Sequence, residues 1–153
     1  MASELSNSAI AEALEELGDL YELDGAIVHR VLAYRGGARA VREAPVSVAA
    51  LAREGKATEL AGIGATLQEK ILALSQTGTI PAMEKLRAKI PPGLIAIGRL
   101  PGVGPKRVRL LHSALGIGSI DALREAALAG KLRTIKGLGP KFEASVLESL
   151  ERG

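Results

Sequence analysis

Three copies of one short glycine phrase constrain the fold of this chain more than any other feature. Each copy has the order apolar, any residue, glycine, apolar, glycine, and the copies lie at residues 60–64, 100–104 and 135–139. They are 40 and then 35 residues apart, which is typical of a repeated supersecondary unit. Glycine lets the backbone turn sharply and lets a partner approach the exposed N–H groups of a following helix. We therefore expect three helix starts that favour anions.

Apolar residues recur with the period of a helix through most of the chain, as in Ile10, Leu14 and Leu17. Helical segments are expected directly after the three glycine phrases, at residues 65–76, 105–115 and 140–151. The last two begin with prolines, whose missing N–H costs nothing at the first helical positions. No segment alternates convincingly like a strand. The sequence therefore predicts an all-α fold in which three helices each follow a glycine turn.

A proline and glycine cluster at residues 91–93 predicts a boundary between two small helical subdomains. The first subdomain, residues 1–90, holds the first glycine phrase, and the second, residues 91–153, holds the other two. A further glycine pair, Gly116 and Gly118, follows a helix and precedes Ser119. We expect this pair to end that helix and Ser119 to cap the next one.

The composition excludes several classes of protein. Apolar residues make up 47% of the chain, which is enough to fold, and there is no cysteine for disulfides, thiol catalysis or thiolate metal sites. With only two histidines, a zinc enzyme is not expected. The sequence shows neither a long apolar run nor a signal peptide, so we expect a soluble cytoplasmic protein with no membrane partner.

The basic residues are unevenly distributed. Residues 1–60 carry more acidic than basic side chains, whereas residues 61–153 carry twice as many basic as acidic ones. No acidic residue lies between Glu84 and Asp121, and that stretch contains Lys85, Arg87, Lys89, Arg99, Lys106, Arg107 and Arg109. A solvated basic face is the plain alternative. Because the stretch contains the second glycine phrase, it favours contact with the phosphates of a nucleic acid.

Aromatic residues are nearly absent, since Tyr21, Tyr34 and Phe142 are the whole set. Recognition of single-stranded bases needs aromatic side chains on which the bases stack. The sequence therefore indicates that DNA is held through its backbone and not through its bases.

Several segments resemble one known family. Residues 26–35, the sequence Glu69-Lys70-Ile71 and the pair Thr77-Gly78 resemble the N-terminal lyase domain of family X DNA polymerases, which are similar to DNA polymerase beta. Residues 99–106, 115–117 and 136–141 resemble the adjoining fingers region of the bacterial members. The resemblance covers roughly residues 7–152 and implies a lyase or DNA-binding domain followed by a tandem helix-hairpin-helix domain. The family's palm and phosphoesterase domains have no counterpart here, so we expect no polymerase activity from this chain alone, whether it stands alone or forms part of a longer polymerase.

The resemblance implies that the three hairpins contact the phosphates of duplex DNA. The phosphate-binding residues would then be Gly62, Gly64, Gly102, Gly104, Lys106, Arg107, Gly137, Gly139 and Lys141. It also implies a monovalent cation, Na⁺ or K⁺, at the main-chain carbonyls of Thr58, Leu60 and Ile63 and of Gly98, Leu100 and Val103. No other cofactor is expected. The alternative is that a hairpin is only a turn that packs within the protein. This alternative is strongest for the third hairpin.

Lys70 matches the family's Schiff-base lysine, which attacks the C1′ aldehyde of a 5′-deoxyribose phosphate before β-elimination. The resemblance places His29 and Tyr34 beside it in a sugar-phosphate pocket, with Arg30 and Arg35 on the phosphate. Two pocket lysines of the family are replaced by Thr66 and Ala82. A lysine whose stem lies along a core face is the structural alternative.

The sequence leaves three functions open. The main prediction is a repair module that binds gapped, nicked or abasic duplex DNA by its structure and not by its sequence, in the cytoplasm and associated with the nucleoid. The second adds 5′-deoxyribose-phosphate lyase activity. The third is an adaptor without catalytic activity, which docks a separate repair polymerase or nuclease.

Overall fold

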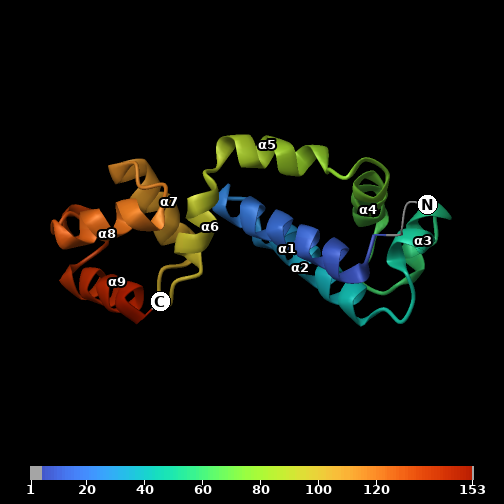
Figure 1. Cartoon of the computed structure of the whole chain (residues 1–153), viewed down its shortest axis with the longest axis horizontal. Helices are drawn as coiled ribbons and strands as arrows, with labels where there is room; N and C mark the ends of the chain where they lie inside the picture. Colours follow the sequence, from blue (N-terminus) through green and yellow to red (C-terminus); the bar gives the residue numbers. More distant parts are fainter. Residues whose placement is uncertain (1–4, 153) are drawn as a thin grey trace. The chain divides into compact units, whose positions relative to one another are not determined.

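The computed structural model describes residues 5–152, and all regular structure in this range is helical, as predicted (Figure 1). No helix in this range is long and apolar enough to cross a membrane. The elements are α1 (Asn7–Leu23), α2 (Val28–Glu43), α3 (Val48–Arg53), η1 (Ala57–Glu59), α4 (Ala65–Thr77), α5 (Pro81–Lys89), α6 (Pro92–Gly98), α7 (Gly104–Leu115), α8 (Ile120–Leu128), η2 (Leu132–Thr134) and α9 (Pro140–Arg152), where η marks a short 3₁₀ helix.

The chain divides into two compact units, Met1–Ala88 and Lys89–Gly153. The sequence places the division slightly later, between residues 90 and 91. Pro92 stands in the first turn of α6. The sequence predicts a boundary at residues 91–93 and makes no prediction for the helices α5 and α6 on its two sides.

In the first unit, α1 and α2 pack side by side along their length (Figure 1). Their apolar faces bury Ile10, Leu14, Leu17 and Leu20 of α1 and Val31, Tyr34, Ala38 and Val41 of α2. The Ser6 side chain caps α1 by accepting a hydrogen bond from the N–H of Ala9 at 3.1 Å. Gly25, with φ +83°, makes the turn between the two helices.

The first glycine turn and the helix that follows it approach α2 closely at two glycines, Gly37 in α2 and Gly62 in the turn. A Cβ on Gly37 would lie 2.6 Å from Cδ1 of Leu67, and a Cβ on Gly62 would lie 3.3 Å from Cβ of Ala40. Glycine inside a helix costs up to about 1 kcal/mol relative to alanine. At Gly37 this cost is compensated by the close approach of Leu67, which anchors α4 on α2.

In the second unit, the end of α7 and the start of α8 agree with the sequence predictions. Gly116 ends α7 in the left-handed conformation, with φ +68°. The Ser119 side chain then accepts a hydrogen bond from the N–H of Ala122 at 3.1 Å and caps α8. The core of this unit is formed by Leu94, Ile97, Val108, Leu111, Leu123, Leu132 and Val146.

Candidate nucleic-acid interface

The three glycine turns share one local geometry. In each, the first glycine has a left-handed backbone, which a residue with a Cβ rarely adopts. The residue between the glycines is buried and donates its N–H to the carbonyl three residues earlier. These first glycines are Gly62 (φ +94°), Gly102 (φ +80°) and Gly137 (φ +96°), and the hydrogen bonds run from Ile63 to Leu60 at 3.1 Å, from Val103 to Leu100 at 3.2 Å and from Leu138 to Ile135 at 3.0 Å.

The helices that follow the first two turns begin without a side-chain cap. Gly64 precedes α4 and Val103 precedes α7, and neither supplies a side-chain acceptor. In contrast, serine side chains cap α1, α3 and α8. The first N–H groups of α4 and α7 are therefore available to an anion, which the helix dipole also favours.

The first and third turns share an equivalent hydrogen bond from a main-chain N–H to a long polar side chain, called the polar latch below. The sequence alone did not predict it. Oε1 of Gln68 accepts a hydrogen bond from the N–H of Thr58 at 3.2 Å, and Oε2 of Glu143 accepts one from the N–H of Arg133 at 3.2 Å. Each latch joins the 3₁₀ helix before the turn to the α-helix after it. The sequence signal is a long polar side chain at the same place after each turn, on a face that is otherwise apolar.

The latch at the third turn also includes an ion pair. Glu143 is only 3% exposed, and its carboxylate accepts hydrogen bonds from Nε of Arg133 at 3.1 Å and from Nη2 at 2.6 Å. These hydrogen bonds hold the pKa of Glu143 below its ordinary value, although burial acts in the opposite direction. The negative charge in the first turn of α9 is therefore neutralised by Arg133, and it does not face an incoming phosphate unpaired.

The second turn is built differently. It follows α6 directly, and its second glycine, Gly104, has a left-handed backbone with φ +68°. An apolar contact replaces the latch, since a Cβ on Gly98 would lie 3.5 Å from Cγ2 of Val108. Nη1 of Arg107 donates a hydrogen bond to the carbonyl of Gly102 at 2.5 Å, and the guanidinium lies 4.9 Å from the ring centroid of Phe142. Arg107 therefore contacts two groups of the protein itself, whereas the sequence predicts that it contacts a DNA phosphate.

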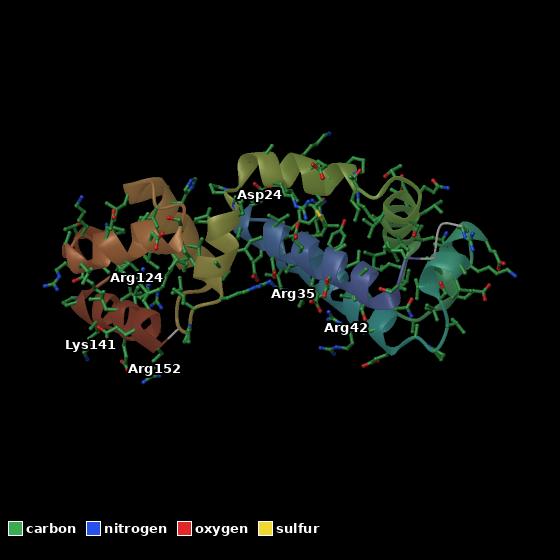
Figure 2. The ribbon with its side chains drawn as sticks, viewed as in Figure 1. Asp24, Arg35, Arg42, Arg124, Lys141 and Arg152 are labelled. Atoms are coloured by element: carbon green, nitrogen blue, oxygen red, sulfur yellow. The ribbon has the colours of Figure 1, made fainter. Side chains whose placement is uncertain are left out.

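Three exposed lysines lie at the second and third turns. Lys106 is in the first turn of α7, Lys136 is inside the third turn, and Lys141, labelled in Figure 2, is in the first turn of α9. Within residues 5–152 these lysines make no hydrogen bond or ion pair, so their charge is available to a ligand. The first turn is less basic, because exposed Glu59 and Glu69 lie in its flanking helices.

Lys70 lies on α4, whereas the other residues assigned to the sugar-phosphate pocket lie on α2. It is half-buried on α4 and has no hydrogen bond or ion pair in the described part of the chain. Exposed His29 and Arg30 lie at the start of α2. The guanidinium of Arg30 is 5.4 Å from the ring centroid of Tyr21, an aromatic that the sequence analysis had not assigned to this group.

Tyr34 is buried beneath this cluster. It is 5% exposed, and its ring stacks on that of Tyr21, with centroids 5.2 Å apart and planes at 21°. Burial, with a further contribution from Tyr21, raises the pKa of Tyr34 from 10.0 to about 12. Burial thus favours the protonated phenol.

Arg35, which the sequence predicts to bind a phosphate, forms ion pairs with acidic side chains of the protein. Its guanidinium pairs with Asp19 at 3.1 Å and with Glu22 at 2.8 Å, both on α1. Its charge is thus compensated within the α1–α2 pair. We leave Arg35 out of the phosphate-binding residues that we propose below.

The monovalent cation at the turn carbonyls stays a prediction. The carbonyls of Leu60 and Leu100 each accept one hydrogen bond within their turn, which leaves a second lone pair on each oxygen. No cluster of three or more histidine or acidic side chains suited to a metal ion occurs in residues 5–152. At the second turn, Arg107 brings a positive charge to Gly102, and this charge opposes a second cation.

Comparison with known proteins agrees with this architecture. Residues 5–80 match the family described as "Helix-hairpin-helix domain", and residues 94–152 match the family described as "SAM-like Helix-hairpin-helix tandem". The chain is also 30% identical over 141 residues to the DNA polymerase/3′-5′ exonuclease PolX of Bacillus subtilis (strain 168). That alignment covers 92% of this chain and 24% of PolX, so the chain spans about a quarter of its relative. Two segments of the chain therefore match helix-hairpin-helix families, and most of the chain is similar to part of a family X polymerase, which supports a role in DNA binding.

Proposed function

We propose that this protein binds gapped, nicked or abasic duplex DNA during DNA repair and recognises it through backbone phosphates, independently of sequence. The observation that carries the proposal is the set of three unpaired lysines at the second and third turns, Lys106, Lys136 and Lys141. Each turn places a lysine beside the start of a helix, where N–H groups and the helix dipole favour a phosphate.

The aromatic residues support recognition of the backbone instead of the bases. Tyr34 is buried, the Tyr21 ring stacks on it and lies beneath Arg30, and the Phe142 ring contacts Arg107. All three rings therefore have contacts within the protein that stacking on a base would have to replace. Phosphate contacts carry no sequence information, so discrimination would come from the shape of the DNA.

The first prediction concerns affinity for DNA and its salt dependence. Fluorescence anisotropy with matched duplexes is expected to show tighter binding to gapped DNA than to intact DNA. Changing both Lys106→Ala and Lys141→Ala removes two phosphate contacts, so the slope of log K against log salt should become shallower by about 1.8 on duplex DNA. Lys85→Ala, which removes an exposed lysine of α5 that lies outside the three turns in sequence, is the control. Unchanged affinity and slope in the double variant would contradict the phosphate sites.

A second function is favoured by the state of Lys70. Its amine has no partner in residues 5–152, and it lies half-buried one turn after Leu67, which anchors α4. We propose that this amine attacks the C1′ aldehyde of a 5′-deoxyribose phosphate and releases water to form a Schiff base. Loss of a C2′ proton then expels the 3′ phosphate by β-elimination, and water releases the enzyme. Arg30 would hold the 5′ phosphate, because its guanidinium suits bidentate contact.

Borohydride trapping tests the lyase proposal, as the second prediction. Reduction in the presence of incised abasic DNA should give a covalent protein–DNA adduct, and Lys70→Ala should abolish it while gapped DNA still binds. Lys56→Ala, which removes an exposed lysine paired with Glu54, is the matched control and should keep the adduct. If the wild type binds gapped DNA but forms no adduct, only the binding function stands. If it binds no DNA at low salt, the adaptor for a separate repair polymerase or nuclease is favoured.

A further inference from the structure

Arg107 connects the second and third glycine turns. Its Nη1 donates to the carbonyl of Gly102 at 2.5 Å, inside the second turn. The same guanidinium lies 4.9 Å from the ring centroid of Phe142, which follows the third turn. One side chain therefore contacts two structures that are 40 residues apart in sequence (Gly102 and Phe142) and belong to the same unit.

The position of this contact matters because both partners lie at helix starts. Arg107 is in the first turn of α7 and Phe142 is in the first turn of α9. Each has an unpaired lysine as its immediate neighbour, Lys106 beside Arg107 and Lys141 beside Phe142. The contact thus fixes the spacing of two helix starts and of the two lysines that accompany them.

The chemistry of the contact favours arginine. A guanidinium presents a flat face to the aromatic ring while its N–H groups in the plane donate to a carbonyl. A lysine ammonium is a compact charge that lacks this plane, so it makes the two contacts together less well. Arg107 therefore differs from Lys106, because the charge of Lys106 has no partner in residues 5–152.

We propose that Arg107 is a positioning residue, which joins the second and third turns through Phe142 so that they bind two DNA phosphates as one rigid surface. The inference rests on the proposed DNA binding and deepens it. It replaces the direct phosphate contact expected of Arg107 from the sequence. Phosphates along a DNA backbone have a set spacing, so two turns held at the matching separation bind with less ordering on association than two independent turns.

The test compares three single variants at Arg107 and Phe142, one double variant and the reference variant Lys106→Ala, all in the whole chain on gapped DNA. Arg107→Lys keeps the charge but not the planar contact, and Phe142→Leu removes the ring but no charge. Both, like Arg107→Ala, should lower the affinity about two- to fivefold, the range expected for an exposed cation–π contact. The salt slope should stay that of the wild type in all three. Lys106→Ala is the reference for a direct contact, with a slope shallower by about 0.9.

The double variant Arg107→Ala/Phe142→Leu should bind no more weakly than either single variant, because both changes remove the same contact. Thermal unfolding of every variant serves as the control for folding. One result would overturn the proposal and show direct phosphate contact. In it, the slope of log K against log salt becomes as shallow for Arg107→Ala as for Lys106→Ala, while Arg107→Lys and Phe142→Leu keep full affinity. A wild type that binds no DNA would instead refute the proposed function itself.

Discussion

Burial and neighbouring side chains determine what individual residues of this protein can do. Tyr34, Arg35 and Arg107 were each predicted to face a DNA ligand, and each makes contacts inside the fold. Tyr34 stacks on Tyr21, Arg35 pairs with two carboxylates of α1, and Arg107 contacts Gly102 and Phe142. At this scale the charges available to a ligand include the exposed lysines that have no partner in residues 5–152.

The raised pKa of Tyr34 predicts a loss of stability in alkali. Below pH 10 the phenol is protonated in both the folded and the unfolded states, so its contribution is complete. Between pH 10 and about 12 the unfolded chain loses this proton while the folded protein keeps it, so the free energy of unfolding falls as the pH rises. The loss attributable to Tyr34 is on the order of 2 kcal/mol.

Urea denaturation across this pH range measures the effect. Tyr34→Phe lacks the ionisable group and keeps the ring, so its stability should fall less steeply than that of the wild type. Apart from this hydroxyl, the two proteins carry the same ionisable groups. Parallel curves for the two proteins would contradict the assignment.

At the scale of elements, the three hairpins have separate structural tasks. The first and third share a 3₁₀ helix and a polar latch, while the second follows α6 and is joined to the third by Arg107. The first turn packs on the glycines of α2 and places Lys70 on the helix that follows it. We therefore expect the second and third turns to supply most of the affinity for DNA.

The packing of α6 predicts one position where a methyl group is not tolerated. A Cβ on Gly93 would overlap the carbonyl oxygen of Gly118 and lie 2.9 Å from Cα of Ser119. Because these are main-chain atoms, Gly93→Ala should displace α6 from the start of α8 and lower the free energy of unfolding by about 1–3 kcal/mol. Chemical denaturation measures this change.

Gly98→Ala, in the same helix, is the matched control. Its Cβ would meet only Cγ2 of Val108 at 3.5 Å, an ordinary contact. The variant should therefore lie close to the wild type in stability. Equal stability of Gly93→Ala and Gly98→Ala would contradict the close approach of α6 and residues 118–119.

At the scale of the whole molecule, the two units divide the proposed chemistry between them. The first holds Lys70 and the Arg30–Tyr21–Tyr34 cluster, and the second holds the unpaired lysines and the Arg107 connection. The charge asymmetry of the sequence agrees with this division, since the acid-free stretch lies mostly in the second unit. Binding and the proposed lyase reaction are therefore separable by variants confined to one unit.

The sequence by itself determined the all-α class, the three turns and the ends of the helices that follow them. These features are local, because a left-handed backbone needs glycine, proline suits a first helical turn, and apolar residues at helical spacing form one buried face. The latches at Gln68 and Glu143 have a local signal as well, but their partners became identifiable only in the folded chain.

Only the tertiary structure decided which cations are available to DNA. Arg35 and Lys141 are equivalent as charges in the sequence, yet the partners of Arg35 lie on another helix, and Lys141 has none among residues 5–152. Arg107 and Lys106 are neighbours in the chain, and the fold gives a ring and a carbonyl to one of them alone. The physical reason is that an ion pair or a cation–π contact depends on the distance between elements, which packing sets and local propensity does not.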